Sequence, residues 1–477
     1  MVIKQSFDRC LSLFTALAIV VGWQMLNCRT VAAGLFEDAV EGEADAEQSP
    51  ATSRSALELN GYVRGDLYMG KAPDKDVTEI KNGYAEAAAK LKVLFGDWGD
   101  GRGEIRLRQG YNGAEVRGEF DLREAFVDLY LGPVDIRLGH QIIVWGRADA
   151  FNPTDNLTPH DMRVRSPNED DRRAANLSLS TTFYFDPVNI ELIYVPFYAP
   201  SHFPVFELPG PISFTPPDYP DMDFEHGTAA SRLNMVLPEV GFSVSYLFGY
   251  STFPGLSLAD FSFGPPPEVS VRFSAYRHHV AGLDFSTTIG DCLGLRGEAA
   301  LRWPVDEPET EHVPLPDVQY VLGVDREFGD FSVIVQYVGR TVLKWEQIEP
   351  TGLLELAQGK TPTPEQLERI LADPEGAARD EVERKTRMIS GQTERYSHAV
   401  TARLAWKLLQ ETLELELLGS YNFTTGEWLV RPKISYSITD GLDAVAGAEI
   451  YGGPDDTLYG TIDETMSAGF VELIAYF

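Results

Sequence analysis

Residues 57–69 read LELNGYVRGDLYM, and their polarity alternates residue by residue. The odd positions, such as Val63 and Met69, are apolar or glycine, whereas the even positions, such as Arg64 and Asp66, are polar or tyrosine. A period of two is typical of a β-strand, because successive side chains of a strand point to opposite faces of the sheet. The pattern therefore predicts a strand with one apolar and one polar face.

The same alternation recurs along the rest of the chain, for example in residues 85–95, 242–250 and 293–303. We count about eighteen such strands, with about sixteen as the alternative. A soluble β-sandwich also alternates, so the pattern alone does not separate a sandwich from a membrane barrel.

The connections between the strands separate these two architectures. Along the chain, tight turns such as those near Gly132, Gly329 and Gly441 alternate with mostly longer connections. The longest connection spans residues 340–394. Short turns on one rim and long loops on the other are typical of outer-membrane barrels. The sequence therefore predicts an all-β fold, a closed antiparallel transmembrane β-barrel with short periplasmic turns and long extracellular loops.

The start of the chain predicts export. Lys4 and Arg9 give a positively charged beginning, and an apolar run follows over residues 11–25. Small residues then precede a cleavage site that we expect after Ala33. Residues 1–33 are therefore predicted to be a signal peptide for export across the inner membrane. Together with the predicted barrel, export predicts a location in the bacterial outer membrane.

The remainder divides into two parts. Residues 34–56 are acidic and are predicted to be a disordered periplasmic lead-in. The barrel is expected over residues 57–477, and its last strand ends at Phe477. In lipid every backbone N–H and C=O group must be paired, so the first and last strands are expected to meet.

Composition and motifs exclude several classes of function. The chain has 40 basic and 72 acidic residues and a formal net charge of −32, which argues against nucleic acid as a partner. No Gly-x-Ser-x-Gly motif is present, and the adjacent His278 and His279 would point to opposite faces of a strand. We expect no cofactor, no metal site and no enzymatic activity.

One segment of the longest loop has helical features. Thr363 and Gln366 fit a capping box around Pro364, which suits the first position of a helix. We expect a short helix on the outer side near residues 363–385. It is either a lid that packs over loop residues or a gate that narrows the mouth.

The polar faces of the strands carry both signs of charge, which suits a weakly selective aqueous path. We expect the fifth strand over residues 134–146. The segment that follows this strand combines acidic residues with arginines and is stiffened by two prolines. In general porins the corresponding loop folds inward and forms the constriction, so analogy points to this segment. The candidate constriction and lumen residues are Arg106, Arg108, Glu124, Asp128, Arg137, Gln141, Arg147, Asp149, Asp155, Arg163 and Arg165.

Several motifs cluster in this region. Residues 122–125 read Leu-Arg-Glu-Ala, residues 137–141 match Arg-x-Gly-x-Gln, and residues 145–155 contain Trp-Gly-Arg-Ala-Asp followed by Asn-Pro-Thr-Asp. Over about residues 103–165 the chain resembles a largely uncharacterised porin-like outer-membrane family of proteobacteria, and Tyr-Gly-Gly at residues 451–453 also fits. The resemblance implies a substrate channel, and family members often occur with inner-membrane exporters of hydrophobic compounds.

Three functions follow as hypotheses. The first is a porin-like channel for passive diffusion of small solutes, constricted by the loop after the fifth strand. The second is a conduit for export or uptake of hydrophobic compounds with an inner-membrane transporter, and the third is an outer-membrane enzyme or structural shell. The expected partners are outer-membrane lipid and lipopolysaccharide, the barrel insertion machinery, further copies of the chain in a homotrimer, and an inner-membrane exporter. The terminal phenylalanine resembles the signal that the insertion machinery recognises.

Overall fold

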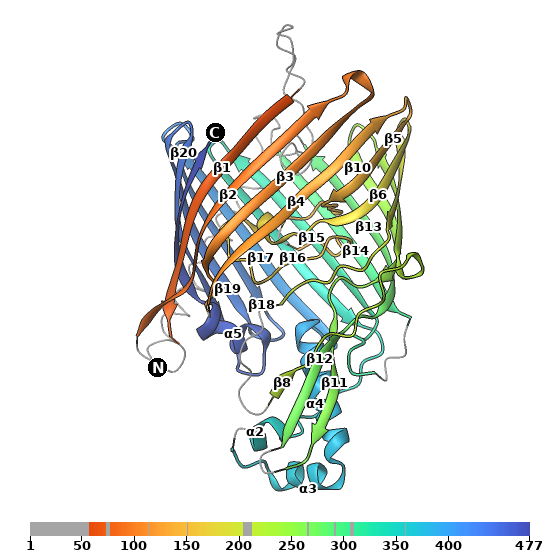
Figure 1. Ribbon diagram of the computed structural model, residues 1–477, viewed down its shortest axis with the longest axis vertical. Helices are drawn as coiled ribbons and strands as arrows, with labels where there is room; N and C mark the ends of the chain where they lie inside the picture. Colours follow the sequence, from red (N-terminus) through yellow and green to blue (C-terminus); the bar gives the residue numbers. More distant parts are fainter. Residues whose placement is uncertain are drawn as a thin grey trace.

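The computed structural model describes residues 57–72, 77–113, 115–149, 151–203, 212–264, 267–290, 292–305, 310–357 and 359–477. The predicted signal peptide (1–33) and the predicted lead-in (34–56) lie outside the described residues. The described chain forms one 18-stranded sheet and one 3-stranded sheet. The larger sheet is a closed barrel, and the smaller one protrudes from one end of it (Figure 1). The strand count predicted from the alternation is confirmed.

Every neighbouring pair of barrel strands is antiparallel, and each barrel strand pairs with the next one along the chain. The strands of the barrel are β1 (Leu57–Lys71), β2 (Thr78–Leu94), β3 (Gly99–Tyr111), β4 (Val116–Tyr130), β5 (Val134–Gln141), β6 (Asn176–Phe185), β7 (Val188–Val195), β9 (Thr228–Val236), β10 (Val240–Tyr250), β13 (Arg277–Ile289), β14 (Leu293–Pro304), β15 (Asp317–Phe328), β16 (Phe331–Val342), β17 (Tyr396–Leu408), β18 (Leu413–Asn422), β19 (Trp428–Thr439), β20 (Leu442–Gly452) and β21 (Ala468–Tyr476).

The barrel closes where β21 pairs with β1, in a register that places Ala475 opposite Val63. Beyond this ladder, the backbone N–H of Gly61 donates to the carbonyl of Phe477, and the N–H of Phe477 donates back to Gly61, both at 3.0 Å. The predicted meeting of the first and last strands is therefore confirmed, and it leaves no open seam between them.

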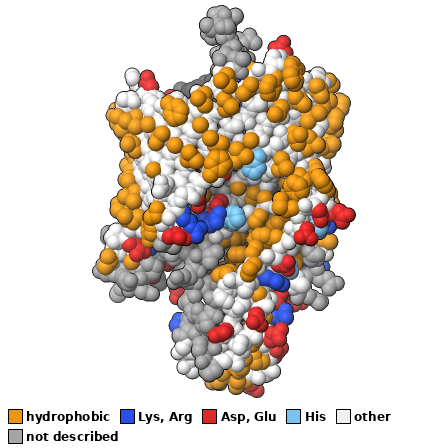
Figure 2. All heavy atoms as spheres, viewed as in Figure 1, with side chains coloured by type: hydrophobic (Ala, Val, Ile, Leu, Met, Phe, Trp, Pro, Cys, Tyr) orange, Lys and Arg blue, Asp and Glu red, His pale blue; other side chains and the backbone are white. Residues whose placement is uncertain are grey.

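The two faces of each strand meet different surroundings, as the alternation predicts. In β1, the side chain of Val63 is 52% exposed, whereas the neighbouring Arg64 is 5% exposed and points inward. Hydrophobic side chains cover much of the outside of the barrel (Figure 2). An apolar exterior on a closed barrel is the architecture of bacterial outer-membrane proteins, and the predicted outer-membrane location is confirmed.

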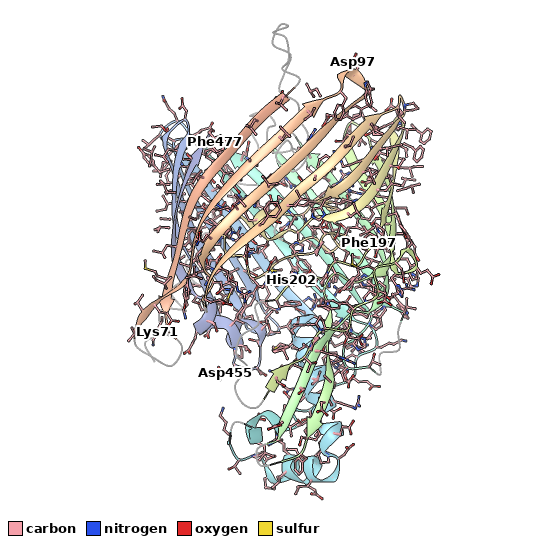
Figure 3. The ribbon with its side chains drawn as sticks, viewed as in Figure 1. Lys71, Asp97, Phe197, His202, Asp455 and Phe477 are labelled. Atoms are coloured by element: carbon pink, nitrogen blue, oxygen red, sulfur yellow. The ribbon has the colours of Figure 1, made fainter. Side chains whose placement is uncertain are left out.

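The two rims differ in the length of their connections. At one rim β15 and β16 are joined through Gly329, and Asp97 lies in a turn at the same end of the barrel (Figure 3). Lys71 and Asp455 lie near the opposite rim, where the longer connections emerge (Figure 3). Among the residues that the structure describes, no helix is long and apolar enough to cross a membrane.

A small outer domain stands beyond the long-loop rim (Figure 1). Its elements are the strands β8 (Ile212–Phe214), β11 (Gly255–Ser262) and β12 (Glu268–Ser274) and the helices α2 (Leu353–Ala357), α3 (Pro364–Ala372) and α4 (Pro374–Ile389). The apolar faces of the helices pack on the sheet, with Ile370 and Val382 buried against Leu256 and Val271. This packing accounts for the buried apolar residues of α3 and α4.

The capping box at the start of α3 is present, with reciprocal hydrogen bonds between Thr363 and Gln366. The helical segment differs from the expected one in being two helices, because Asp373 ends α3 and its side chain caps the N-terminus of α4. Pro374 then occupies the first turn of α4, where its missing N–H removes no hydrogen bond.

The apolar exterior can be tested on β13, where Leu283 and Ile289 point outward on the same face at 51% and 52% exposure. Leu283 is central in the strand and Ile289 is at its rim end. We expect Leu283→Arg to destabilise the barrel by about 2–4 kcal/mol and Ile289→Arg by about 0–1 kcal/mol, because the cost of a charge falls with distance from the bilayer midplane. Urea titration of unfolding in lipid vesicles measures both values. Equal costs at the two positions would contradict a lipid-facing β13.

Candidate functional site

The loop between β5 and β6, residues 142–175, turns into the barrel. The fifth strand ends at Gln141, earlier than the predicted end at residue 146, because the next two N–H groups donate to side chains and not to the backbone of a neighbouring strand. The N–H of Ile142 donates to the carboxylate of Glu124 at 2.8 Å, and the N–H of Ile143 donates to Thr158 Oγ1 at 2.9 Å. The strand predicted over residues 134–146 is therefore five residues too long.

The first contact of this loop with the barrel interior is apolar. Trp145 and Leu157 are buried against inward-facing side chains of β7, β9, β10, β13 and β14. Among these side chains are Ile193, Leu247 and Val280. This apolar cluster lies inside the barrel, so one side of the lumen is filled with protein.

Glu298 on β14 holds the same part of the loop through hydrogen bonds. Its carboxylate accepts from the backbone N–H groups of Arg147 and Ala148 and, at 3.0 Å, from the hydroxyl of Thr154. The guanidinium of Arg147 in turn contacts Asp284 on β13 at 2.7 Å. These bonds fix the loop beside β13 and β14.

Buried ion pairs hold the far end of the loop against the opposite side of the barrel. Asp171 contacts Arg64 of β1 at 2.6 Å and Arg106 of β3 at 2.8 Å, and it accepts from Ser166 at 2.6 Å. Burial alone would raise the pKa of Asp171, but the two arginines lower it below its usual range. Asp171 is therefore ionised at neutral pH and holds the loop against β1 and β3.

A third attachment is made to β20. Glu449, which is almost fully buried, contacts Arg165 at 3.1 Å and Arg172 at 3.4 Å. Arg165 also donates to the backbone carbonyl of Met466 at 2.5 Å. With attachments to β14, β1 and β20, the loop crosses the lumen from one side to the other.

A cavity of about 1640 Å³ remains beside the loop. Its lining includes Phe203 and Phe214 at the outer end and Ser437 and Tyr476 near the short-turn rim. Between these ends it is bounded by the loop on one side and by inward-facing residues of β17 to β21 on the other. The cavity therefore extends along most of the length of the barrel.

Charged side chains of both signs meet where the cavity passes the loop. Arg403 of β17 contacts Asp149 of the loop at 3.3 Å and Glu416 of β18 at 2.7 Å. Nearby, Glu169 of the loop pairs with Arg172 at 2.8 Å and also with Arg431 of β19. Charges on the wall and on the loop thus compensate each other across this part of the lumen.

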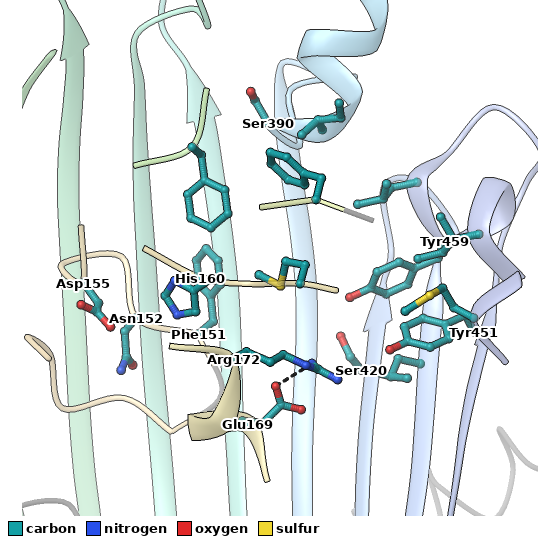
Figure 4. A pocket seen from close by; sticks show the side chains of 18 of the residues that line it. Phe151, Asn152, Asp155, His160, Glu169, Arg172, Ser390, Ser420, Tyr451 and Tyr459 are labelled. Carbon is teal, nitrogen blue, oxygen red and sulfur yellow. Dashed lines mark hydrogen bonds and ion pairs between the residues drawn. The ribbon is translucent and has the colours of Figure 1, made fainter. Parts of the chain in front are cut away.

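Aromatic side chains complete this passage. His160 and Phe151 of the loop lie on one side of the cavity, and Tyr451 and Tyr459 lie on the other (Figure 4). The two tyrosine rings contact each other edge to face, with centroids 5.4 Å apart. Arg172 extends between the two sides from below them (Figure 4).

The structure places all but one of the predicted site residues in two groups. The first group holds or belongs to the inward-folded loop and comprises Arg106, Arg147, Asp149, Asp155, Glu124 and Arg165. Of these, Asp149 and Asp155 line the cavity. Asp155 pairs with Arg173 at 3.4 Å, and burial raises its pKa to about 7 although Arg173 acts in the opposite direction.

The second group makes contacts within the barrel wall, away from the cavity lining. It comprises Arg108, which pairs with Glu86, Asp128, which pairs with Arg137, and Gln141, which donates to the carbonyl of Ser178. Arg163 belongs to neither group, because its half-exposed side chain pairs with Asp161 of the same loop and does not line the cavity.

The sequence did not single out the wall that faces the loop across the cavity. On this wall, β17, β18 and β19 line the cavity with Arg403, Glu416, Arg431 and Lys433. Alternation places these residues on the inward face, but it gives no sign of which side of the lumen the loop leaves open. That side is set by the burial of Trp145 and Leu157 against the far wall.

Removing the Glu298 carboxylate tests how the loop is held. In Glu298→Ala the N–H groups of Arg147 and Ala148 lose their acceptor, and we expect their hydrogen exchange to become roughly 10- to 100-fold faster. Hydrogen-exchange mass spectrometry of the peptide around residues 145–158 measures this. The control is Glu414→Ala, a carboxylate that lines the cavity from β18. Unchanged exchange in Glu298→Ala would mean that Trp145 and Leu157 suffice to hold the loop.

No protein-family model matches the chain, and no curated protein matches it in sequence. Solved structures of outer-membrane proteins are similar to it in shape. OpdK of Pseudomonas aeruginosa has a TM-score of 0.49 at 8% sequence identity, over 88% of this chain and 97% of that one. A BenF-like porin of Pseudomonas fluorescens Pf-5 has a TM-score of 0.49 at 9% identity, over 88% and 98%. OccAB4 of Acinetobacter baumannii has a TM-score of 0.47 at 10% identity, over 89% and 98%. Identity this low does not carry residue roles from one chain to another.

Proposed function

We propose that this chain is a porin-like channel through which small solutes diffuse passively across the outer membrane. The constriction is formed by the β5–β6 loop on one side and by the inward faces of β17 to β20 on the other. The cavity of about 1640 Å³, which has lining residues near both rims, is the observation that carries this proposal.

The way the loop is held supports the same function. Its attachments to β14, β1 and β20 use buried ion pairs and an apolar cluster, so the loop is fixed inside the barrel and does not hang freely in the mouth. A fixed loop that fills one side of the lumen narrows the path and leaves the other side open. This arrangement suits a channel whose width is set by the fold.

The charges along the path support weak ionic selectivity. Arg403, Arg431 and Lys433 on the wall are accompanied by Glu416 on the same wall and by Asp149 on the loop. A channel dedicated to anions or cations would carry a row of one sign. Opposite charges facing each other orient polar solutes and select only weakly among ions.

Planar-bilayer recordings of the purified protein test the proposal. We expect stepwise increases in current as single barrels insert, because each barrel adds one water-filled path. Circular dichroism and heat-modifiable migration on gels establish that the inserted protein is folded. A folded barrel that stays silent over many insertions would refute passive diffusion.

The location of the path is tested by a charge reversal on the wall. Arg403→Glu replaces a positive charge beside Asp149 and Glu416, so we expect the permeability ratio of K⁺ to Cl⁻ to rise severalfold. The reversal potential in a salt gradient measures this ratio. The matched control is Arg163→Glu, the same change of charge at a half-exposed residue outside the cavity lining, for which we expect no shift. Equal shifts in the two variants would place the path elsewhere.

A further inference from the structure

A row of aromatic rings leads from the outer domain to the inward-folded loop. Phe214 of β8 stacks on Phe273 of β12 with ring centroids 5.8 Å apart, and Phe273 stacks on Phe203 at 5.7 Å. Phe203 contacts Phe253 at 5.7 Å, and Phe253 stacks on His160 of the loop at 5.9 Å. We call these five residues the aromatic row. They come from three separate connections between barrel strands, so only the tertiary structure brings them together.

The aromatic row is open to the cavity. All five of its members line the cavity, and the side chains of Phe214 and Phe253 are 38% and 37% exposed. Rings that served only to hold the outer domain together would be buried away from the cavity, as Ile370 and Ala377 are in the core of that domain. The row therefore presents aromatic surface to any solute that enters from outside.

Apolar side chains line the cavity next to the row, together with the polar Thr252 and the charged Glu381 and Lys385. Pro254, Leu256, Val271, Leu315 and Met388 border the same part of the cavity. A sugar that stacked on the rings would leave its hydroxyl groups without partners against such side chains, at a cost in free energy. An aromatic ring has no such groups, and it stacks on other aromatic rings favourably.

Beyond His160 the surroundings become polar. The cavity next passes Arg172 and Glu169 and then Arg403, Arg431 and Glu416. A solute that follows the row inward therefore leaves apolar side chains and meets paired charges and water. This change suits a molecule with an aromatic ring at one end and a polar group at the other.

We propose that the aromatic row is a binding path for small amphipathic solutes that carry an aromatic ring. It holds the ring of the solute outside the constriction and delivers the polar end to the charged passage. This inference rests on the proposed channel function for its role in transport, but binding to the row does not require conduction.

The test uses three neutral, water-soluble glucosides that differ only in the group attached to the sugar: phenyl, cyclohexyl and methyl β-D-glucoside. Binding to the full-length barrel in amphipol is measured by calorimetry, and block of the ion current is measured in bilayers. We expect phenyl glucoside to bind roughly tenfold more tightly than methyl glucoside and more tightly than cyclohexyl glucoside, because only the phenyl group stacks. Equal binding of all three would show a sugar site and overturn the proposal, as would equal binding of the phenyl and cyclohexyl compounds.

Variants locate the binding to the row. Phe203→Leu with Phe253→Leu keeps apolar side chains but removes two stacked rings, and we expect the preference for the phenyl compound to fall close to one. The control is Phe263→Ala, an exposed phenylalanine of the outer domain that does not line the cavity and contacts Phe261 at 6.4 Å. A preference that survives in the double variant, or that is lost in the control, would overturn the proposal.

The two readouts separate this inference from the proposed function. A barrel that binds the phenyl compound selectively but carries no current would refute the channel and leave the binding path intact. A barrel that conducts but has no preference among the three glucosides would refute the binding path and leave the channel intact.

Discussion

A backbone N–H or C=O group finds no hydrogen-bond partner in lipid, and this requirement shapes the whole molecule. It forces β21 to pair with β1, and the mutual hydrogen bonds of Gly61 and Phe477 complete that seam. Once the sheet is closed, one face of every strand is outside and one is inside. The apolar residues then face the membrane, and the polar residues face an enclosed space that must be filled with water, with protein or with both.

The inward-folded loop determines how that space is divided. Trp145 and Leu157 fill the side of the lumen next to β7 to β14 with an apolar cluster. The ion pairs of Asp171 with Arg64 and Arg106 then fix the far end of the loop. Each of these three buried charges has a partner of opposite sign, which offsets the cost of removing it from water. The open part of the lumen is what remains between the loop and β17 to β21.

The outer domain and the lumen are continuous through the aromatic row. The same residues that pack α3 and α4 on the small sheet also position β12, and β12 carries Phe273 of the row. The helices that the sequence indicated near residue 363 thus support the entrance to the cavity from outside the barrel. Their apolar faces are used in packing on β11 and β12.

Alternation with a period of two and the sorting of short and long connections were sufficient to predict the barrel, its strand number and its lipid-facing residues, because these features are local in the sequence. The capping box at Thr363 was readable for the same reason. The partners of the loop were not readable, because Glu298, Glu449 and Asp171 meet their partners across more than 60 positions of the chain or across the lumen. The position of the loop decides which inward-facing residues line the cavity, as Arg403 does, and which are buried, as Arg106 is. Only the folded barrel determines the position of the loop.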